Sequence, residues 1–153
     1  MSSTSHNTLT VTGRGVPKML KSIKSKDSAF DFKRVKPYPL TFKFNSWGLH
    51  RGKFSHSAPT WDGWNCDWCV ENWGTTWVTW DPVIHKFKGG ATIDFGTQYV
   101  PPIPVITKLS EQFPRLVFEM EFIDTQSEWA GRARWSKGNL EYAVDTTDKI
   151  TNF

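Results

Sequence analysis

The chain has 153 residues and a formal net charge of +4, with 15% aromatic and 22% charged residues. This length suits a single domain with a substantial core, and the aromatic content excludes a disordered chain. The sequence has no run of about 18 apolar residues, which excludes a membrane-spanning helix. A charged and then apolar secretory signal is absent from its first residues, so we expect a cytoplasmic protein.

The charge is distributed unevenly along the chain. Residues 1–60 hold eleven Lys and Arg against Asp27 and Asp31, a balance of +9. Residues 61–153 hold eight basic and thirteen acidic residues, a balance of −5. A basic first third indicates an anionic partner, and the alternative is a solvated surface that keeps the protein soluble.

The first third of the chain predicts a strand followed by a helix. Alternating apolar and polar residues predict a strand over 7–12. Four apolar residues then recur at helical spacing, namely Val16, Met19, Leu20 and Ile23. We therefore expect a short amphipathic helix over 16–23, with Lys18 and Lys21 on its outer face.

A proline-interrupted stretch and an aperiodic stretch follow this helix. Pro37 and Pro39 predict an extended or loop-like segment over residues 30–40. Residues 48–60 have no clear period and are rich in turn-forming residues, so we expect a surface loop there.

Tryptophans are concentrated in the stretch that comes next. They are Trp61, Trp64, Trp68, Trp73, Trp77 and Trp80. The first three have the spacing of one helical stripe, and Gly74 ends that pattern. β-Branched and aromatic residues predict a strand over 75–80. We interpret this helix, glycine and strand as the organiser of the core, with most of the indoles buried.

The rest of the chain predicts further strands and one helix. The strands are expected over residues 83–87, 91–99, 116–124, 128–135 and 140–144. The helix is expected from Pro101 to Gln112, because its apolar residues have helical spacing and Pro114 follows. Helices on one face of a mainly antiparallel sheet make an α+β, ferredoxin-like (split βαβ) fold. We expect one such domain over residues 1–153, with residues 1–6 and 146–153 frayed.

Several of these pieces resemble a known family. They are NTLTVTG at residues 7–13, WCVENWGTTW at 68–77, VPPIPVITKLSEQFP at 100–114 and the closing strand-turn-strand. This combination resembles the YubB-like ferredoxin-like domain family of phages and conjugative plasmids. The resemblance implies a ferredoxin-like fold, a mobile-element origin and a role in the bacterial host cytoplasm, and it brings no catalytic residue. The lysines of residues 14–53 and the additional Trp61 and Trp64 depart from the family pattern.

The two cysteines, Cys66 and Cys69, invite a metal or redox interpretation. With His50 and His56 they could supply four zinc ligands, but the order is unusual and both cysteines lie mid-helix beside bulky indoles. No strand leads directly into the motif, as a thioredoxin-type pair requires. We therefore expect two free thiols, no bound metal and no cofactor. The resemblance also implies that Cys69 is a packing residue.

Two kinds of function fit the remaining chemistry. His50 and His56 flank Arg51 and Lys53, which suits acid–base cleavage of RNA, although no motif supplies a third partner. Basic residues interleaved with aromatics suit single-stranded nucleic acid or a nucleotide, or equally an acidic protein partner. The candidate partner-binding residues are Lys18, Lys21, Lys33, Arg34, Lys36, Arg51 and Lys53. The candidate aromatic platforms are Tyr38, Trp47, Trp61 and Trp64.

We expect a non-enzymatic accessory protein of a phage or plasmid that counters host defence. It would inhibit a host immune complex, such as a CRISPR effector, through its basic and aromatic surface, or sequester a nucleotide signal. The alternatives are a small histidine-dependent nuclease or phosphodiesterase, and a nucleic-acid-binding accessory protein.

Overall fold

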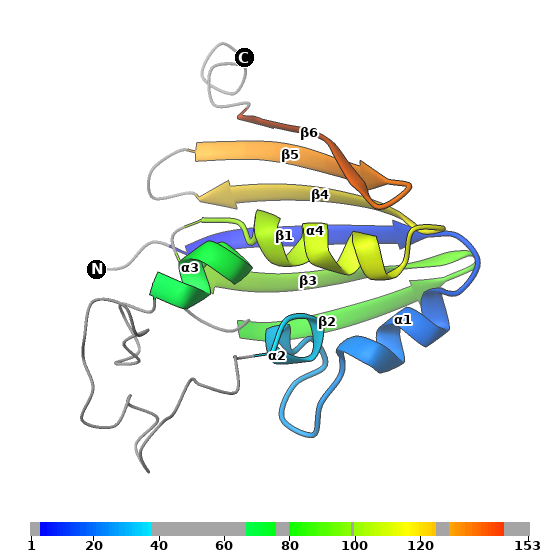
Figure 1. The fold of residues 1–153 in the computed structure, drawn as a ribbon. Coiled ribbons are helices and arrows are strands. Elements are labelled where there is room, and N and C mark those ends of the chain that lie inside the picture. The colour runs from blue at the N-terminus through cyan, green and yellow to red at the C-terminus, as the bar shows by residue number, and fades with distance from the viewer. Residues whose placement is uncertain (1–3, 38–66, 76–79, 99, 125–128, 146–153) are drawn as a thin grey trace.

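One six-stranded antiparallel sheet, with the strand order β2-β3-β1-β4-β5-β6, carries all the described helices on one of its faces (Figure 1). The computed structural model describes residues 4–37, 67–75, 80–98, 100–124 and 129–145. The strands are β1 (Thr4–Thr12), β2 (Trp80–Phe87), β3 (Gly90–Gln98), β4 (Val117–Asp124), β5 (Trp129–Ser136) and β6 (Asn139–Asp145). The helices are α1 (Val16–Ile23), α2 (Phe32–Val35), α3 (Asp67–Trp73) and α4 (Ile103–Gln112). None of these helices has the length and apolar character needed to span a bilayer.

The four strands β2, β3, β1 and β4 have the order and connections of a ferredoxin-like fold. β1 is antiparallel to both β3 and β4, and β3 separates β1 from β2. β1 and β2 are therefore parallel and are joined through helices, which makes the split βαβ unit. α4 joins β3 to β4, and β5 and β6 extend the sheet beyond β4. The predicted α+β, ferredoxin-like fold is confirmed.

The core lies between the helices and the sheet face that they cover. Along β1, Leu9 and Val11 are buried, whereas the threonines between and beside them stay partly exposed. β4 shows the same alternation, as its sequence predicts. The helical stripe predicted for α1 is buried against this face and consists of Val16, Met19, Leu20 and Ile23. We call the opposite, uncovered side of the sheet the open face.

Trp73 is the last residue of α3 and is fully buried. Its ring packs on Phe32 with 5.9 Å between the ring centroids, and its Nε1 donates a hydrogen bond to the Lys36 carbonyl oxygen at 2.9 Å. Phe30 and Phe95 extend the aromatic cluster, with their ring centroids 5.0 Å apart. The predicted burial of Trp73 is confirmed. The other tryptophans that were expected to organise the core with it lie largely outside the described residues.

α2 corrects the prediction of an extended segment over residues 30–40. One helical turn forms there because Asp31 caps it, accepting a hydrogen bond from the Lys33 backbone N–H at 3.0 Å. The Asp31 N–H in turn donates to the Ile23 carbonyl oxygen at 2.8 Å, which joins the start of α2 to the end of α1. Pro37 follows the turn and so does not obstruct it.

Some element boundaries also differ from those expected. β1 begins at Thr4, where it pairs with Gln98 of β3, rather than at residue 7. The strand expected after Pro82 begins earlier, at Trp80, because a bulge between Trp80 and Val83 lets β2 pass through the proline. The tryptophan helix is described from Asp67 onward. The expected surface loop over 48–60 lies outside the described residues.

Candidate functional site

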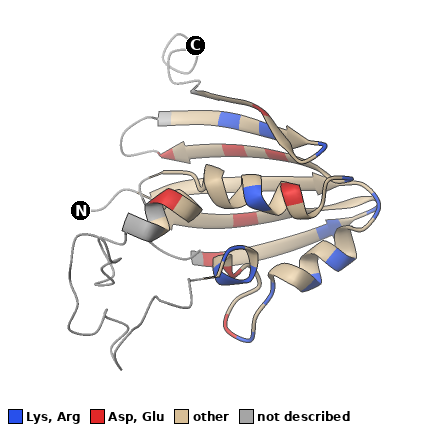
Figure 2. Ribbon diagram, in the orientation of Figure 1, with Lys and Arg blue, Asp and Glu red and all other residues tan. Residues whose placement is uncertain are grey.

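Basic residues gather on α1, on α2 and in the segments beside them (Figure 2), and seven of them have exposed side chains. We call this set the basic surface, and it consists of Arg14, Lys18, Lys21, Lys24, Lys26, Lys33 and Arg34. The outer face of α1 presents Lys18 and Lys21, because the opposite side of that helix is buried. The bond between Asp31 and Ile23 holds α2 next to α1, so both helices contribute to one region.

No residue of the basic surface makes an ion pair with another described residue. Arg134, on the open face, by contrast makes two ion pairs. Its Nη1 lies 3.1 Å from Glu119 Oε2 and its Nε lies 2.9 Å from Glu141 Oε1. The hydrogen bond to Glu141 is the main reason that the pKa of Arg134 is raised above its usual value. The positive charge of the basic surface is therefore directed toward solvent rather than toward internal carboxylates.

The α2 part of the basic surface is less positive than the α1 part. Lys33 lines a hollow of about 430 Å³ together with Asp27, Asp31 and Asp81, where the segment between α1 and α2 meets the start of β2. These carboxylates lower the local potential without pairing with Lys33. Lys36 is only partly exposed, and its carbonyl oxygen accepts a hydrogen bond from the Trp73 indole N–H. The outer face of α1 is thus the most positive part.

The remaining predicted site residues lie outside the described residues. They are Tyr38, Trp47, Arg51, Lys53, Trp61 and Trp64. Sequence reasoning also missed Lys86, Phe87 and Lys88 at the β2–β3 hairpin, which lies against the start of α1. Their proximity to α1 depends on the fold, and the only local signal was an apolar strand residue between two lysines.

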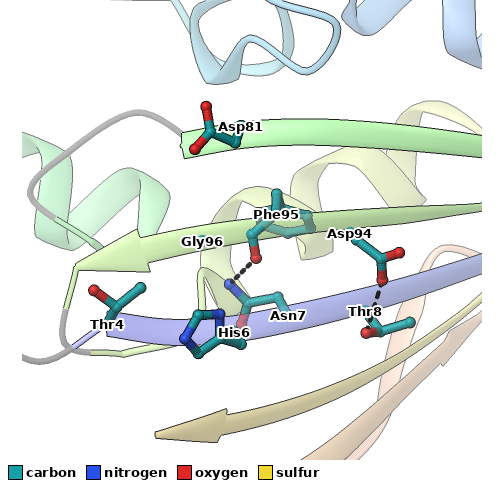
Figure 3. A pocket seen from close by; sticks show the side chains of 8 residues that line it. All are labelled: Thr4, His6, Asn7, Thr8, Asp81, Asp94, Phe95 and Gly96. Carbon is teal, nitrogen blue, oxygen red and sulfur yellow. Dashed lines mark hydrogen bonds between the residues drawn. The ribbon is translucent and has the colours of Figure 1, made fainter.

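The described histidines, His6 and His85, lie on the open face. His6 lines a hollow of about 420 Å³ there (Figure 3). The Nε2 atom of His85 lies 3.6 Å from Asp94 Oδ2, and Asp94 Oδ1 accepts a hydrogen bond from Thr8 Oγ1 at 3.0 Å. Gly96 of β3 and Asp81 of β2 also line the hollow, next to the bulge between Trp80 and Val83.

The nuclease or phosphodiesterase alternative stays a prediction. His50 and His56, the histidines first considered for this chemistry, lie outside the described residues.

Cys69 corrects the expectation of free thiols. It is fully buried in the core and disulfide-bonded. A disulfide sulfur does not supply the thiolate that zinc requires, so Cys69 is not available as a metal ligand in this structure. The described part of the chain contains no group of three or more His, Cys, Asp or Glu that could hold a metal ion. The other candidate ligands, His50, His56 and Cys66, lie outside it.

Comparison with known proteins places this chain in a family. Residues 63–151, more than half of the chain, match the family model described as "Ferredoxin-like domain in Api92-like protein". The chain belongs to this family. The Api92-like match confirms the expected ferredoxin-like family, whereas the YubB-like designation and the phage or plasmid origin stay predictions.

A solved structure supports the same fold. The protein api92 from Yersinia pseudotuberculosis matches 75% of this chain with a TM-score of 0.56 and 16% sequence identity. This chain covers 39% of the length of that structure. No curated protein matches the chain in a sequence comparison. The Api92-like match begins at residue 63, so the basic surface lies in the part of the chain that precedes it.

Proposed function

We propose that this protein is a non-enzymatic binding protein that holds an anionic partner on its basic surface. The observation that supports this function is the concentration of exposed Lys and Arg on and around α1 and α2 without ion pairs among the described residues. Residues 13–37 hold eight Lys and Arg against Asp27 and Asp31, and Asp31 is buried as the cap of α2.

Repulsion among the clustered positive charges of the basic surface destabilises the fold unless negative charges offset it. Charges of one sign repel over about 8 Å at physiological ionic strength, and helical spacing brings Lys18 and Lys21 within that range. An anionic partner converts this repulsion into attraction and also accelerates encounter. The fold does not require these clustered positive charges, whereas binding of an anionic partner does.

Counter-defence is the biological setting that we propose for this binding. The protein would then be a phage or plasmid accessory protein acting in the bacterial host cytoplasm. It would inhibit a host immune complex by binding an acidic surface or nucleic acid of that complex, or sequester a nucleotide signal. The basic surface supplies Lys and Arg for each of these targets, because acidic proteins present carboxylates, and nucleic acids and nucleotides present phosphates.

Reversal of charge on α1 tests the proposed function. We expect the double variant Lys18→Glu/Lys21→Glu to keep its fold, because both side chains are exposed on the outer face of the helix. Its affinity for fluorescein-labelled oligoglutamate and decathymidylate, measured by anisotropy, should fall at least about tenfold. The salt slope of decathymidylate binding, measured between about 50 and about 200 mM salt, should fall by about 1 for each lost phosphate contact.

A matched control separates local from overall charge. Arg132→Glu/Lys137→Glu changes the net charge by the same amount at two exposed positions, on β5 and in the β5–β6 turn, away from α1. We expect this control to retain most of the wild-type affinity. Equal weakening in both double variants, or in neither, would show that the basic surface serves only solubility.

A further inference from the structure

A small apolar groove lies beside the basic surface, between α1 and the β2–β3 hairpin. It has a volume of about 180 Å³. Val16, Pro17 and Leu20 line it from α1, Lys86 and Phe87 line it from β2, and glycines of the adjoining turns complete it. Phe87, the last residue of β2, remains 48% exposed.

Glycines keep this groove open and hold its walls in place. A Cβ atom at Gly90 would lie 2.7 Å from Phe87 Cζ, so the ring rests directly against the β3 backbone. The Gly13 N–H donates a hydrogen bond to the Gly89 carbonyl oxygen at 3.1 Å, which joins the turn before α1 to the hairpin turn. The groove is therefore formed by backbone contacts before any partner arrives.

Positive charge surrounds the groove. Lys86 is part of its lining, and Lys88 is exposed in the hairpin turn next to Gly89. Arg14 is exposed next to Gly13, so the bond between the two glycines brings the Arg14 and Lys88 segments together. Among the described residues Lys86 and Lys88 make no ion pair. The groove is thus an apolar centre with a basic rim that continues onto the outer face of α1.

We infer that this groove receives one apolar side chain of an acidic polypeptide, whose carboxylates contact the surrounding Lys and Arg residues. This inference rests on the proposed function and names the class of partner. Ligand pockets for small molecules usually have volumes of about 300–1,000 Å³, so the groove fits a single side chain better than a whole ligand. An apolar anchor inside a charged rim is the usual organisation of a protein–protein interface.

The lining favours a polypeptide over a nucleic acid. Single-stranded nucleic acids are held by aromatic faces on which successive bases stack. Here the α1 wall consists of Val16, Pro17 and Leu20, and Phe87 is the one aromatic residue in the lining. A mostly apolar lining suits an aliphatic side chain, whereas a base would leave much of its polar edge unpaired.

The test compares two fluorescein-labelled oligoglutamate peptides that differ at one central residue, leucine or alanine. We expect the wild-type protein to bind the leucine peptide about tenfold more tightly, because the larger side chain is removed from water. Phe87→Ala should abolish this preference while leaving the affinity for the alanine peptide within about twofold. Tyr142→Ala, which truncates an exposed aromatic residue on β6, is the matched control and should keep the preference.

A second variant, Pro17→Asp, tests whether the preference can be lost while the protein stays folded. Pro17→Asp puts a carboxylate at the exposed edge of the groove, and an acidic residue in the first turn favours the helix. It should also abolish the preference for leucine while the circular dichroism spectrum stays that of the wild type.

The outcomes separate this inference from the proposed function. Equal binding of both peptides by the wild type would overturn the apolar anchor, even if Lys18→Glu/Lys21→Glu still weakened both. Tighter binding of decathymidylate than of either peptide, weakened by Phe87→Ala, would assign the groove to a nucleic acid and overturn the inference. If the charge-reversed variant bound every probe as the wild type does, the proposed function itself would fail.

Discussion

Trp73 shows how one side chain connects several elements. It ends α3, packs on Phe32 of α2 and donates its indole N–H to the Lys36 carbonyl oxygen. We expect Trp73→Ala to lower the free energy of unfolding by about 3–5 kcal/mol, because a large cavity forms and the partly buried Lys36 carbonyl loses its donor. Trp73→Phe should cost less, since it retains ring contact. Urea denaturation followed by far-UV circular dichroism measures both, and a loss under about 1 kcal/mol in Trp73→Ala would place the side chain outside the core.

Glu141 gives the open face a pH-dependent contact. Its pKa is lowered mainly by a hydrogen bond with Ser136 and next by the hydrogen bond with Arg134. A lowered folded-state pKa means that the ionised group stabilises the fold above the unfolded-state pKa of about 4.3, and that this contribution is lost as the pH falls through the folded-state pKa. The melting temperature of Glu141→Gln should therefore lie below that of the wild type at neutral pH, and the gap should close in acid.

The control for this effect is Glu121→Gln, at an exposed glutamate of β4 that makes no ion pair among the described residues. It should show little difference from the wild type at any pH. A gap for Glu141→Gln that persisted at acid pH would indicate that the side chain acts through packing rather than through its charge.

At the scale of elements, Gly74 sets how α3 meets α4. Its φ is +90°, and a Cβ atom there would lie 2.4 Å from Pro104 Cδ. We expect Gly74→Ala to destabilise the protein by about 2–4 kcal/mol, because it combines left-handed backbone strain with overpacking. Chemical denaturation measures the loss. This contact also explains why a glycine follows Trp73 in the stretch that resembles a known family.

Gly89 supplies the matched control for that element. Its φ is +85°, but no atom lies within 4 Å of an added Cβ. Gly89→Ala should therefore lose only the stability that left-handed backbone strain costs, about 1–2 kcal/mol. If the two alanine variants were equally destabilised, the contact between Gly74 and Pro104 would relax without cost.

At the scale of the whole molecule, the sheet is stabilised from its centre outward. β1 is paired along most of its length with both β3 and β4, whereas β6 pairs only with β5 among the described strands. We expect the β1 amides to exchange most slowly with deuterium and those of β6 to exchange fastest among the strands, as measured by mass spectrometry. Protection of β6 equal to that of β1 would show that the edge of the sheet is covered, for example by self-association.

The amino-acid sequence by itself determined the local elements of this protein. Alternation along β4, the apolar stripe of α1, the glycine turn of the β2–β3 hairpin and the prolines before α4 each act within a few residues. Steric preference and burial of one face then suffice to specify strand or helix. Their order along the chain also predicted the ferredoxin-like fold, and the outer positions of α1 predicted the exposure of Lys18 and Lys21.

Only the tertiary structure decided the features that join distant parts of the chain. Asp31 caps α2 locally, but the position of this turn on the core depends on the packing of Phe32 against Trp73 and Phe95. The apolar groove forms because the bond from Gly13 to Gly89 holds the turn before α1 against the hairpin that contains Phe87. These contacts depend on strand pairing, in which residues far apart in the sequence become neighbours. No local pattern encodes that neighbourhood, and the proposed binding surface depends on it.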